Sequence, residues 1–216
     1  MRKIVFVILI LLSNKLFAQV ELTAGMGIGF VNNSSVTDYV NLNFAANGKQ
    51  LKSFNSAIDF YIEADYSISN SFQLGLEYDA VYFSYTNLQV TSGDYELNYY
   101  HYKPSLVAFY VFRGAGYNFK FGGGAGPRFI SLEEKLPLVS ARQNYKSSGV
   151  GFLLKGQGNT LLGGNFYANI AVDMRYDFPG EPEDGNGQAL VNNSFRENVN
   201  VNSLTFGLKL GVSYFF

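Results

Sequence analysis

The sequence predicts an all-β protein, an eight-stranded antiparallel up-and-down transmembrane β-barrel, and three observations lead to this prediction. The 216 residues include 23 Gly, 20 Phe and 16 Tyr but only 5 Pro, a composition typical of strands and turns. Apolar and polar residues alternate with a period of two over long stretches, as a strand with two different faces requires. Short and long connections alternate between these stretches, which is the pattern of bacterial membrane barrels.

Residues 1–18 have the pattern of a secretory signal peptide. Two basic residues precede an apolar run, Ile4 to Leu12, and Ala18 offers a small residue for cleavage. The apolar run is shorter than the roughly 20 residues that a membrane-spanning helix needs. We therefore expect cleavage after Ala18, leaving residues 19–216 as a single exported domain.

The first four alternating runs follow in chain order. Residues 20–30 place aliphatic residues and Phe on one face, and Glu, Thr and Gly on the other. Residues 58–68 and 72–82 repeat the alternation, with Asp and Glu on the polar face. Residues 101–112 begin in the same way, but Val and Phe also occur on the polar face toward the end of the run. Each run is predicted to be one strand.

Four further runs complete the set. Residues 117–129 alternate aromatic residues with Asn, Lys, Gly and Arg, and residues 150–157 alternate more weakly. Residues 166–178 show the cleanest alternation, and residues 203–216 carry the last run to the end of the sequence. Eight is an even number of strands, as expected for an antiparallel bacterial barrel.

The connections between the runs fall into two classes. Three are tight turns, at residues 69–71, 113–116 and 163–165. Four are predicted to be long loops, at residues 32–54, 87–97, 132–148 and 179–200. Short turns at one end and long loops at the other are typical of outer-membrane barrels.

A soluble sandwich or lipocalin-like barrel would show the same alternation with the apolar face turned inward. The chain has only 15% charged residues, against about 25% in a typical soluble domain. The runs are also longer than the usual strand of about 5–6 residues. Aromatic residues such as Tyr66, Phe166 and Tyr214 occur at the ends of the apolar faces, where a membrane barrel has its aromatic girdles. These observations favour an apolar face turned toward lipid.

Two stretches of the sequence resemble those of a known family, namely the terminal stretch Leu208 to Phe216, including Tyr214 and Phe216, and the Gly-rich stretch Phe121 to Phe129. Through them the chain resembles the OmpA-like and PorT-like outer-membrane β-barrel proteins. The terminal stretch is similar to the C-terminal signal that such barrels present to the barrel assembly machinery. The resemblance implies insertion into the lipid of the bacterial outer membrane, and it implies no catalytic residue.

The polar faces of the runs carry charges that the barrel would turn inward. The early runs carry acidic residues, the middle runs carry basic residues, and the last two runs mix both signs. Unpaired charges in a low-dielectric interior are costly, so we expect these walls to meet in a structural salt-bridge network. A regulated or leaky ion path is the alternative. The residues of the expected network are Glu63, Asp65, Glu77, Asp79, Lys103, Lys120, Arg128, Lys155, Asp173, Arg175 and Lys209.

Several kinds of chemistry find no support in the composition. With no Cys and a single His, His101, the chain offers no thiolate and little imidazole chemistry. The net charge of −1 predicts no nucleic-acid partner. The Gly-rich residues 114–126 lack the Gly-Lys-Ser/Thr ending of a phosphate-binding loop and a helix after it, so no cofactor is expected. The acidic residues of 179–200 leave calcium binding open, with a solvated acidic loop as the alternative.

The first long connection is predicted to be a β-hairpin that stands above the membrane. An Asn-Gly pair is the strongest short signal for a hairpin turn, and alternating residues precede it. Its apolar side chains would pack on neighbouring loops or contact a partner. The residues of this expected hairpin are Tyr39, Val40, Leu42, Phe44, Asn47 and Gly48.

The functional prediction is a non-enzymatic, monomeric outer-membrane barrel with a structural or adhesive role. Its long loops would contact a partner, either an extracellular protein or a component of a secretion machine. The alternative from another class is a small pore or a secretion or transport accessory protein.

Overall fold

The computed structural model describes residues 19–45, 50–51, 54–89, 93–139 and 141–216. The expected signal peptide lies outside these residues. Among the described residues, no helix has the length and apolarity that a membrane crossing requires.

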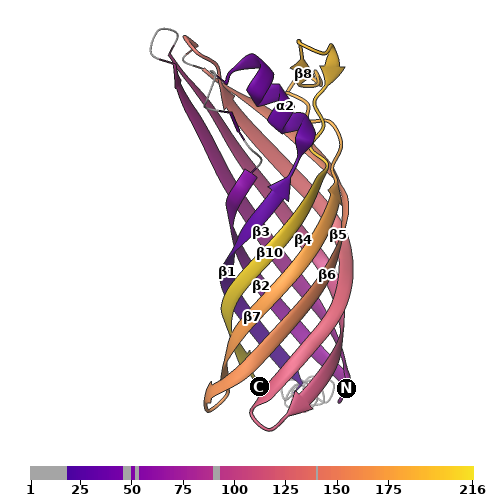
Figure 1. Ribbon diagram of the computed structural model, residues 1–216. Coiled ribbons are helices and arrows are strands. Elements are labelled where there is room, and N and C mark those ends of the chain that lie inside the picture. Colours follow the sequence, from indigo (N-terminus) through magenta and orange to yellow (C-terminus); the bar gives the residue numbers. More distant parts are fainter. Residues whose placement is uncertain (1–18, 46–49, 52–53, 90–92, 140) are drawn as a thin grey trace, which may run out of the picture.

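Eight long strands of the described chain form one closed barrel, which confirms the predicted fold (Figure 1). Strands that follow one another around the barrel pair in antiparallel fashion, and the last strand closes the ring against the first. A closed ring leaves no unpaired sheet edge inside a membrane. The barrel strands are β1 (Val20–Asn32), β2 (Phe54–Ser69), β3 (Phe72–Gln89), β4 (Gly93–Gly114), β5 (Tyr117–Lys135), β6 (Arg142–Gly163), β7 (Phe166–Phe178) and β10 (Ser203–Phe215).

The three predicted tight turns lie together at one end of the barrel, called the turn end, where β1 begins and β10 ends (Figure 1). Each turn leaves two residues between its strands. Gly116 (φ 79°) and Gly164 (φ 57°) adopt the left-handed conformation that favours glycine. The opposite end, called the loop end, carries the longer connections.

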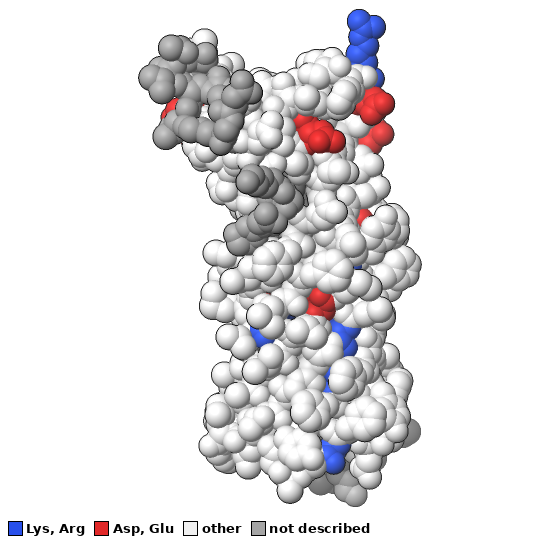
Figure 2. All heavy atoms as spheres, viewed as in Figure 1, with Lys and Arg blue, Asp and Glu red and all other residues white. Residues whose placement is uncertain are grey.

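The apolar faces of the strands point outward and the polar faces point inward, as predicted. On β7, Ile170 and Val172 are 56% and 55% exposed, whereas Asn169 is 1% exposed. The barrel wall below the loop end is mostly uncharged in the view of Figure 2. Such a continuous apolar exterior is stable against lipid and unfavourable in water, so the wall spans a membrane.

Two of the predicted long loops are wrong, because the strands continue through them. β3 and β4 pair from Phe72–Tyr110 to Gln89–Gly93, and β5 and β6 pair as far as Lys135–Arg142. Only residues 90–92 and 136–141 remain as connections. The pattern reverses in these extensions, since Leu97 and Tyr99 point inward and Asn98 points outward. Beyond the lipid, water surrounds the sheet, so the outward positions become polar.

The predicted hairpin in the first connection is also wrong, because residues Ser34–Asn43 form helix α2. Asn33 caps this helix, since its Oδ1 accepts a hydrogen bond from the backbone N–H of Val36 at 3.0 Å. Val36, Tyr39 and Val40 recur at helical spacing and form the buried face of the helix. Of the expected hairpin residues, Leu42 is in the helix and half-exposed, Phe44 follows it, and Asn47 and Gly48 lie outside the described residues.

A hydrophobic core lies at the loop end, above the polar lumen. α2 and the connection between β7 and β10 fold over the inner face of the extended strands (Figure 1). That connection includes the two short paired strands β8 (Val191–Asn192) and β9 (Glu197–Asn198). We call α2 and residues 179–202 the cap. The buried residues of this core are Val31, Val36, Tyr39, Val40, Leu51, Ala57, Val81, Tyr95, Leu97, Tyr99, Ile130, Leu132, Leu190, Val199 and Val201.

A smaller apolar cluster lies inside the barrel toward the turn end. Val107, Phe109 and Val111 on β4 pack with Leu153 on β6. The three β4 residues are those that interrupt the alternation of the fourth run. The Lys120 ammonium lies 5.0 Å from the centre of the Phe109 ring, so this cluster adjoins the charged lumen.

Candidate functional site

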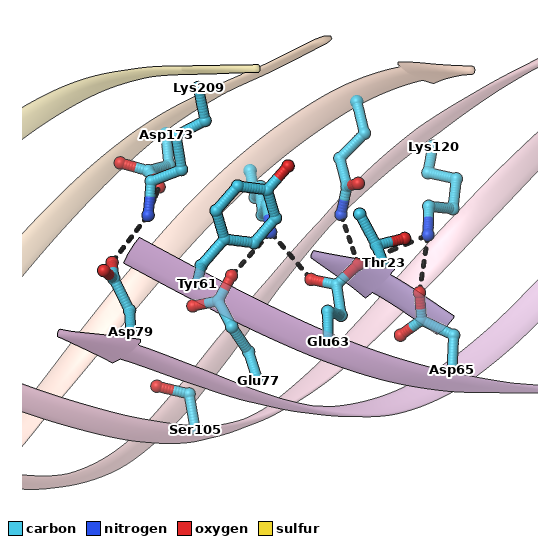
Figure 3. A network of polar contacts seen from close by, with 12 residues as sticks. Thr23, Tyr61, Glu63, Asp65, Glu77, Asp79, Ser105, Lys120, Asp173 and Lys209 are labelled. Carbon is cyan, nitrogen blue, oxygen red and sulfur yellow. Dashed lines mark hydrogen bonds and ion pairs between the residues drawn. The ribbon is translucent and has the colours of Figure 1, made fainter. Parts of the chain in front are cut away.

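The centre of the barrel holds a chain of ion pairs that begins at Lys120 on β5. Its Nζ lies 3.0 Å from Glu21 Oε1, 3.3 Å from Glu63 Oε1 and 2.5 Å from Asp65 Oδ2. Lys155 on β6 continues the chain, at 2.7 Å from Glu63 Oε2 and 2.5 Å from Glu77 Oε2. Glu63 thus joins cations of two strands across the lumen (Figure 3).

Two further cations extend the same chain toward the loop end. Arg175 Nη2 lies 2.7 Å from Glu77 Oε1, 3.2 Å from Asp79 Oδ2 and 2.8 Å from Asp173 Oδ2. Lys209 Nζ lies 2.6 Å from Asp79 Oδ2 and 3.2 Å from Asp173 Oδ2. The acidic residues of β2 and β3 therefore meet bases from four other strands, β5, β6, β7 and β10.

Tyr61 occupies the middle of this network, although it was not among the residues selected from the sequence (Figure 3). Its hydroxyl donates to Asn169 Oδ1 at 2.7 Å. The ammonium groups of Lys155 and Lys209 lie 4.8 Å and 5.1 Å from its ring centre. An aromatic ring stabilises nearby cations through its quadrupole. The sequence could have pointed to Tyr61, because it is an aromatic residue on the polar, acidic face of the second run.

A second cluster surrounds Asp177 near the loop end. Lys103 Nζ lies 3.1 Å from Asp177 Oδ2, and Arg128 donates from Nε to Asp177 Oδ1. Arg128 was expected to face the carboxylates of β2 and β3, and the structure corrects this, because Arg128 forms its ion pair with Asp177 on β7. His101 Nε2 lies 4.0 Å from Asp177 Oδ2, and His101 Nδ1 is 2.9 Å from the Tyr99 hydroxyl.

The charged side chains of the lumen are almost completely buried. The side chains of Lys120, Lys155 and Lys209 are 0% exposed, and those of Lys103 and Arg175 are 1% exposed. Eight strands leave an interior that side chains can just fill. Buried, paired charges of this kind fix how the walls pack and give bulk solvent no access to a reacting group. His101 is 1% exposed and so is not placed to serve as a base for a substrate from solution.

The cap is anchored by a buried carboxylate on β5. Glu134 Oε1 accepts hydrogen bonds from the Tyr39 hydroxyl of α2 at 2.7 Å and from the Tyr95 hydroxyl of β4 at 2.9 Å. Burial raises the pKa of Glu134, although both tyrosine hydrogen bonds oppose the rise. Burial likewise raises the pKa of Tyr39 and of Tyr95, so both phenols stay protonated as donors.

Hydrogen bonds also join α2 to the rest of the loop end. Asn41 exchanges two hydrogen bonds with the backbone of Leu51, at 2.8 Å and 2.7 Å. Asn43 donates to Asn192 Oδ1 at 3.1 Å. The cap is therefore a folded unit with side-chain contacts between its parts.

The acidic part of the cap does not gather metal ligands. Asp184 accepts hydrogen bonds from the backbone N–H groups of Asn186 and Gln188, at 2.8 Å and 2.9 Å. These bonds, that of Gln188 foremost, lower the pKa of Asp184. Within the described residues, no three His, Cys, Asp or Glu side chains come together as a metal site would require.

The last residues of the chain lie at the barrel seam. The Tyr214 ring contacts the rings of Phe166 and Phe216, with centres 4.9 Å and 4.8 Å apart. The backbone N–H of Phe216 donates to the carbonyl of Val20 at 3.1 Å, across the β1–β10 junction. An assembly signal placed here would belong to the strand that closes the barrel.

Large apolar side chains are exposed at the loop end, where no lipid covers them. Leu138 and Val139 in the β5–β6 turn are 85% and 42% exposed. Val191 and Phe195 in the β8–β9 segment are 40% and 58% exposed. Exposed apolar groups on a folded surface above a membrane are candidate contacts for a partner.

Comparison with known proteins identifies the fold. No protein-family model and no curated protein matches the sequence. Neisserial surface protein A matches with a TM-score of 0.52 and 14% identity over 91% of this chain and 97% of that chain. A major outer membrane protein of Thermus thermophilus matches with a TM-score of 0.56 and 14% identity, over 90% and 98%. Ail of Yersinia pestis, crystallised with the heparin analogue sucrose octasulfate, matches at 0.52 and 13%, over 91% and 98%. The chain therefore has the fold of the outer-membrane β-barrels, in its eight-stranded form.

Proposed function

We propose that the protein is a non-enzymatic, monomeric OmpA-like or PorT-like barrel of the bacterial outer membrane that presents a folded surface to a protein partner. Residues 1–18 would direct its export, and Tyr214 and Phe216 would direct its assembly. The observation that carries this proposal is the cap, a structured unit on a barrel whose lumen charges are buried in ion pairs. Such a barrel would serve as a rigid support that holds the cap at the membrane surface, where a partner could bind it.

The buried lumen argues against the alternative of a small pore. A conducting path requires water around the permeating ion, whereas the cations of the lumen have 0–1% exposed side chains. We expect no stable conductance from the folded protein in a planar bilayer. A reproducible single-channel current would replace the scaffold proposal with the pore.

Site-specific photo-crosslinking in intact cells tests the proposed partner. A photoreactive residue at Phe195 or Val139 should capture a protein, because both positions are exposed at the loop end. The same probe at Asn165, in the exposed β6–β7 turn, is the control at the turn end. Capture at the turn end alone would instead favour an accessory role in a secretion machine. Capture at neither end would contradict a protein partner.

A further inference from the structure

A polar groove of about 460 Å³ opens in the outer wall at the loop end. It lies between β6 and the chain that leaves β7. Its lining brings together an aromatic ring, a hydroxyl, a cation and two carboxylates from segments far apart in the sequence. The main lining residues are Phe129, Lys146, Ser148, Pro179, Glu181 and Glu183.

The groove exists because β6 and β7 part and the chain then returns. Their pairing begins at Val150 and Phe178, and beyond it Gly149 lets the departing chain pass closely. A Cβ on Gly149 would overlap the Phe178 carbonyl oxygen and would lie 2.7 Å from Pro179 Cα. The returning chain rejoins β6 through two backbone hydrogen bonds between Lys146 and Glu183, at 2.8 Å and 2.9 Å. Backbone contacts therefore hold both ends of the groove in place.

The groove lies at the level where the lipid headgroups begin. Phe129 pairs across the sheet with Tyr102 on one side and Ser148 on the other, so all three share one row. Tyr102 also contacts Tyr82 in the tyrosine cluster of the outer wall, with ring centres 6.4 Å apart. Such aromatic rows mark the membrane–water interface of a barrel. In the next row toward the loop end, Ser131 and Lys146 are polar.

The chemistry of the lining suits a phosphorylated sugar. Phe129 is 48% exposed and offers an apolar ring face to the C–H groups of a sugar. The carboxylate of Glu183 and the hydroxyl of Ser148 are partners for sugar hydroxyls. No carboxylate of the described residues lies within ion-pair distance of Lys146 Nζ, which is therefore available to a phosphate. Glu181 accepts a hydrogen bond from Asn198 at 2.7 Å, which fixes its position.

We propose that this groove binds the phosphorylated saccharide headgroup of a glycolipid in the outer leaflet. The site is separate from the surface proposed for the protein partner, since neither Val139 nor Phe195 lines the groove. Binding would add a specific lipid contact next to the cap, through Asn198 of β9.

Native mass spectrometry of the folded protein tests the groove. The probes are lipopolysaccharide, phosphatidylglycerol and free glucosamine 1-phosphate, each added to detergent-solubilised protein. Lipopolysaccharide should be retained more strongly than phosphatidylglycerol, because phosphatidylglycerol has the phosphate but no sugar ring. Retention of the free sugar phosphate as well would show that the groove binds the headgroup without the acyl chains. Retention of lipopolysaccharide without the free sugar phosphate would show that the ligand is the membrane glycolipid and that a soluble sugar phosphate is not.

Two variants and one control make the test specific. K146Q and E183A leave the backbone bonds of the groove in place, and each should weaken lipopolysaccharide retention about fivefold, as the loss of one exposed polar contact predicts. K135Q is the matched control, because Lys135 lies at the same end of the barrel and pairs with Glu96 outside the groove. The gel mobility of unboiled samples verifies folding. Equal retention of the two lipids, or unchanged retention in both variants, would overturn the proposal.

Discussion

Replacing Lys155 by Met should destabilise the folded barrel strongly. The ammonium of Lys155 lies 2.7 Å from Glu63 Oε2 and 2.5 Å from Glu77 Oε2, and all three side chains are 0% exposed. It also lies 4.8 Å from the centre of the Tyr61 ring. Methionine fills much of the same volume but carries no charge. The substitution therefore leaves two buried carboxylates with less compensation while changing packing little.

The expected loss follows from the partners that remain. Removing one partner of a buried ion pair typically costs about 3–5 kcal/mol. Glu63 keeps Lys120 at 3.3 Å, and Glu77 keeps Arg175 at 2.7 Å, so we expect the lower end of that range. Lys135→Met is the matched control, because Lys135 and Glu96 form an ion pair whose side chains are 32% and 24% exposed. Breaking an exposed pair costs about 0–1 kcal/mol.

Urea unfolding in phospholipid vesicles measures both variants, with the folded fraction read from the gel mobility of unboiled samples. The free energy of unfolding should fall by at least about 2 kcal/mol more for Lys155→Met than for Lys135→Met. Adding Glu77→Gln to Lys155→Met should restore part of the loss, because it removes an uncompensated charge. If the two single variants were equally stable, the ion pairs of Lys155 would have to be hydrated. That result would refute the expectation that they are buried away from water.

Three further predictions follow from the wall, a glycine and the cap. Ile170→Arg at the lipid-facing centre of β7 should cost about 2–4 kcal/mol of folding free energy in vesicles, and Leu162→Arg at the turn end of β6 about 0–1 kcal/mol; equal costs would place the wall outside a membrane. Gly122→Ala should lower the free energy of unfolding by about 1–3 kcal/mol, because its Cβ would overlap the Ala108 carbonyl oxygen, whereas Gly163→Ala meets nothing within 4 Å and should be neutral. Burial raises the pKa of Glu134, so the folded cap binds this proton more tightly than the unfolded chain and loses stability as pH rises from the ordinary pKa through the raised one. Hydrogen-exchange protection of α2 should therefore fall over that interval in the intact protein and stay level in Glu134→Gln.

Asn169 shows how the structure changes an expectation drawn from the sequence. Alternation alone suggests that an inward polar position tolerates a large polar residue such as Arg. In the structure, Asn169 donates to Gln157 and Asn159 and accepts from Tyr61, and it is 1% exposed. An Arg there would overfill a packed network. The sequence gives the direction of a side chain, but the space around it depends on the opposite walls.

The cap illustrates a conflict between two local patterns. Tyr39 and Val40 fit an alternating strand, and the same residues with Val36 fit a helix at positions i, i+3 and i+4. Asn33 is a helix-capping residue three positions before Val36. The helix forms because its apolar face meets the core of the extended strands, a surface that exists only once those strands are assembled.

The sequence by itself determined the strands of the membrane wall, their faces and the tight turns. Side chains of a strand alternate strictly, and lipid requires an apolar residue at every outward position. The local pattern is therefore sufficient to tell which side chains face lipid and which face the lumen. Beyond the lipid this rule ends, and the extensions of β4 and β5 place apolar residues inward and polar residues outward. Only the tertiary structure decided which lumen charges pair, because partners such as Lys155 and Glu77 are 78 positions apart and meet through the closure of the ring. The cap and the groove also depend on the tertiary structure, because their residues come from segments far apart in the sequence.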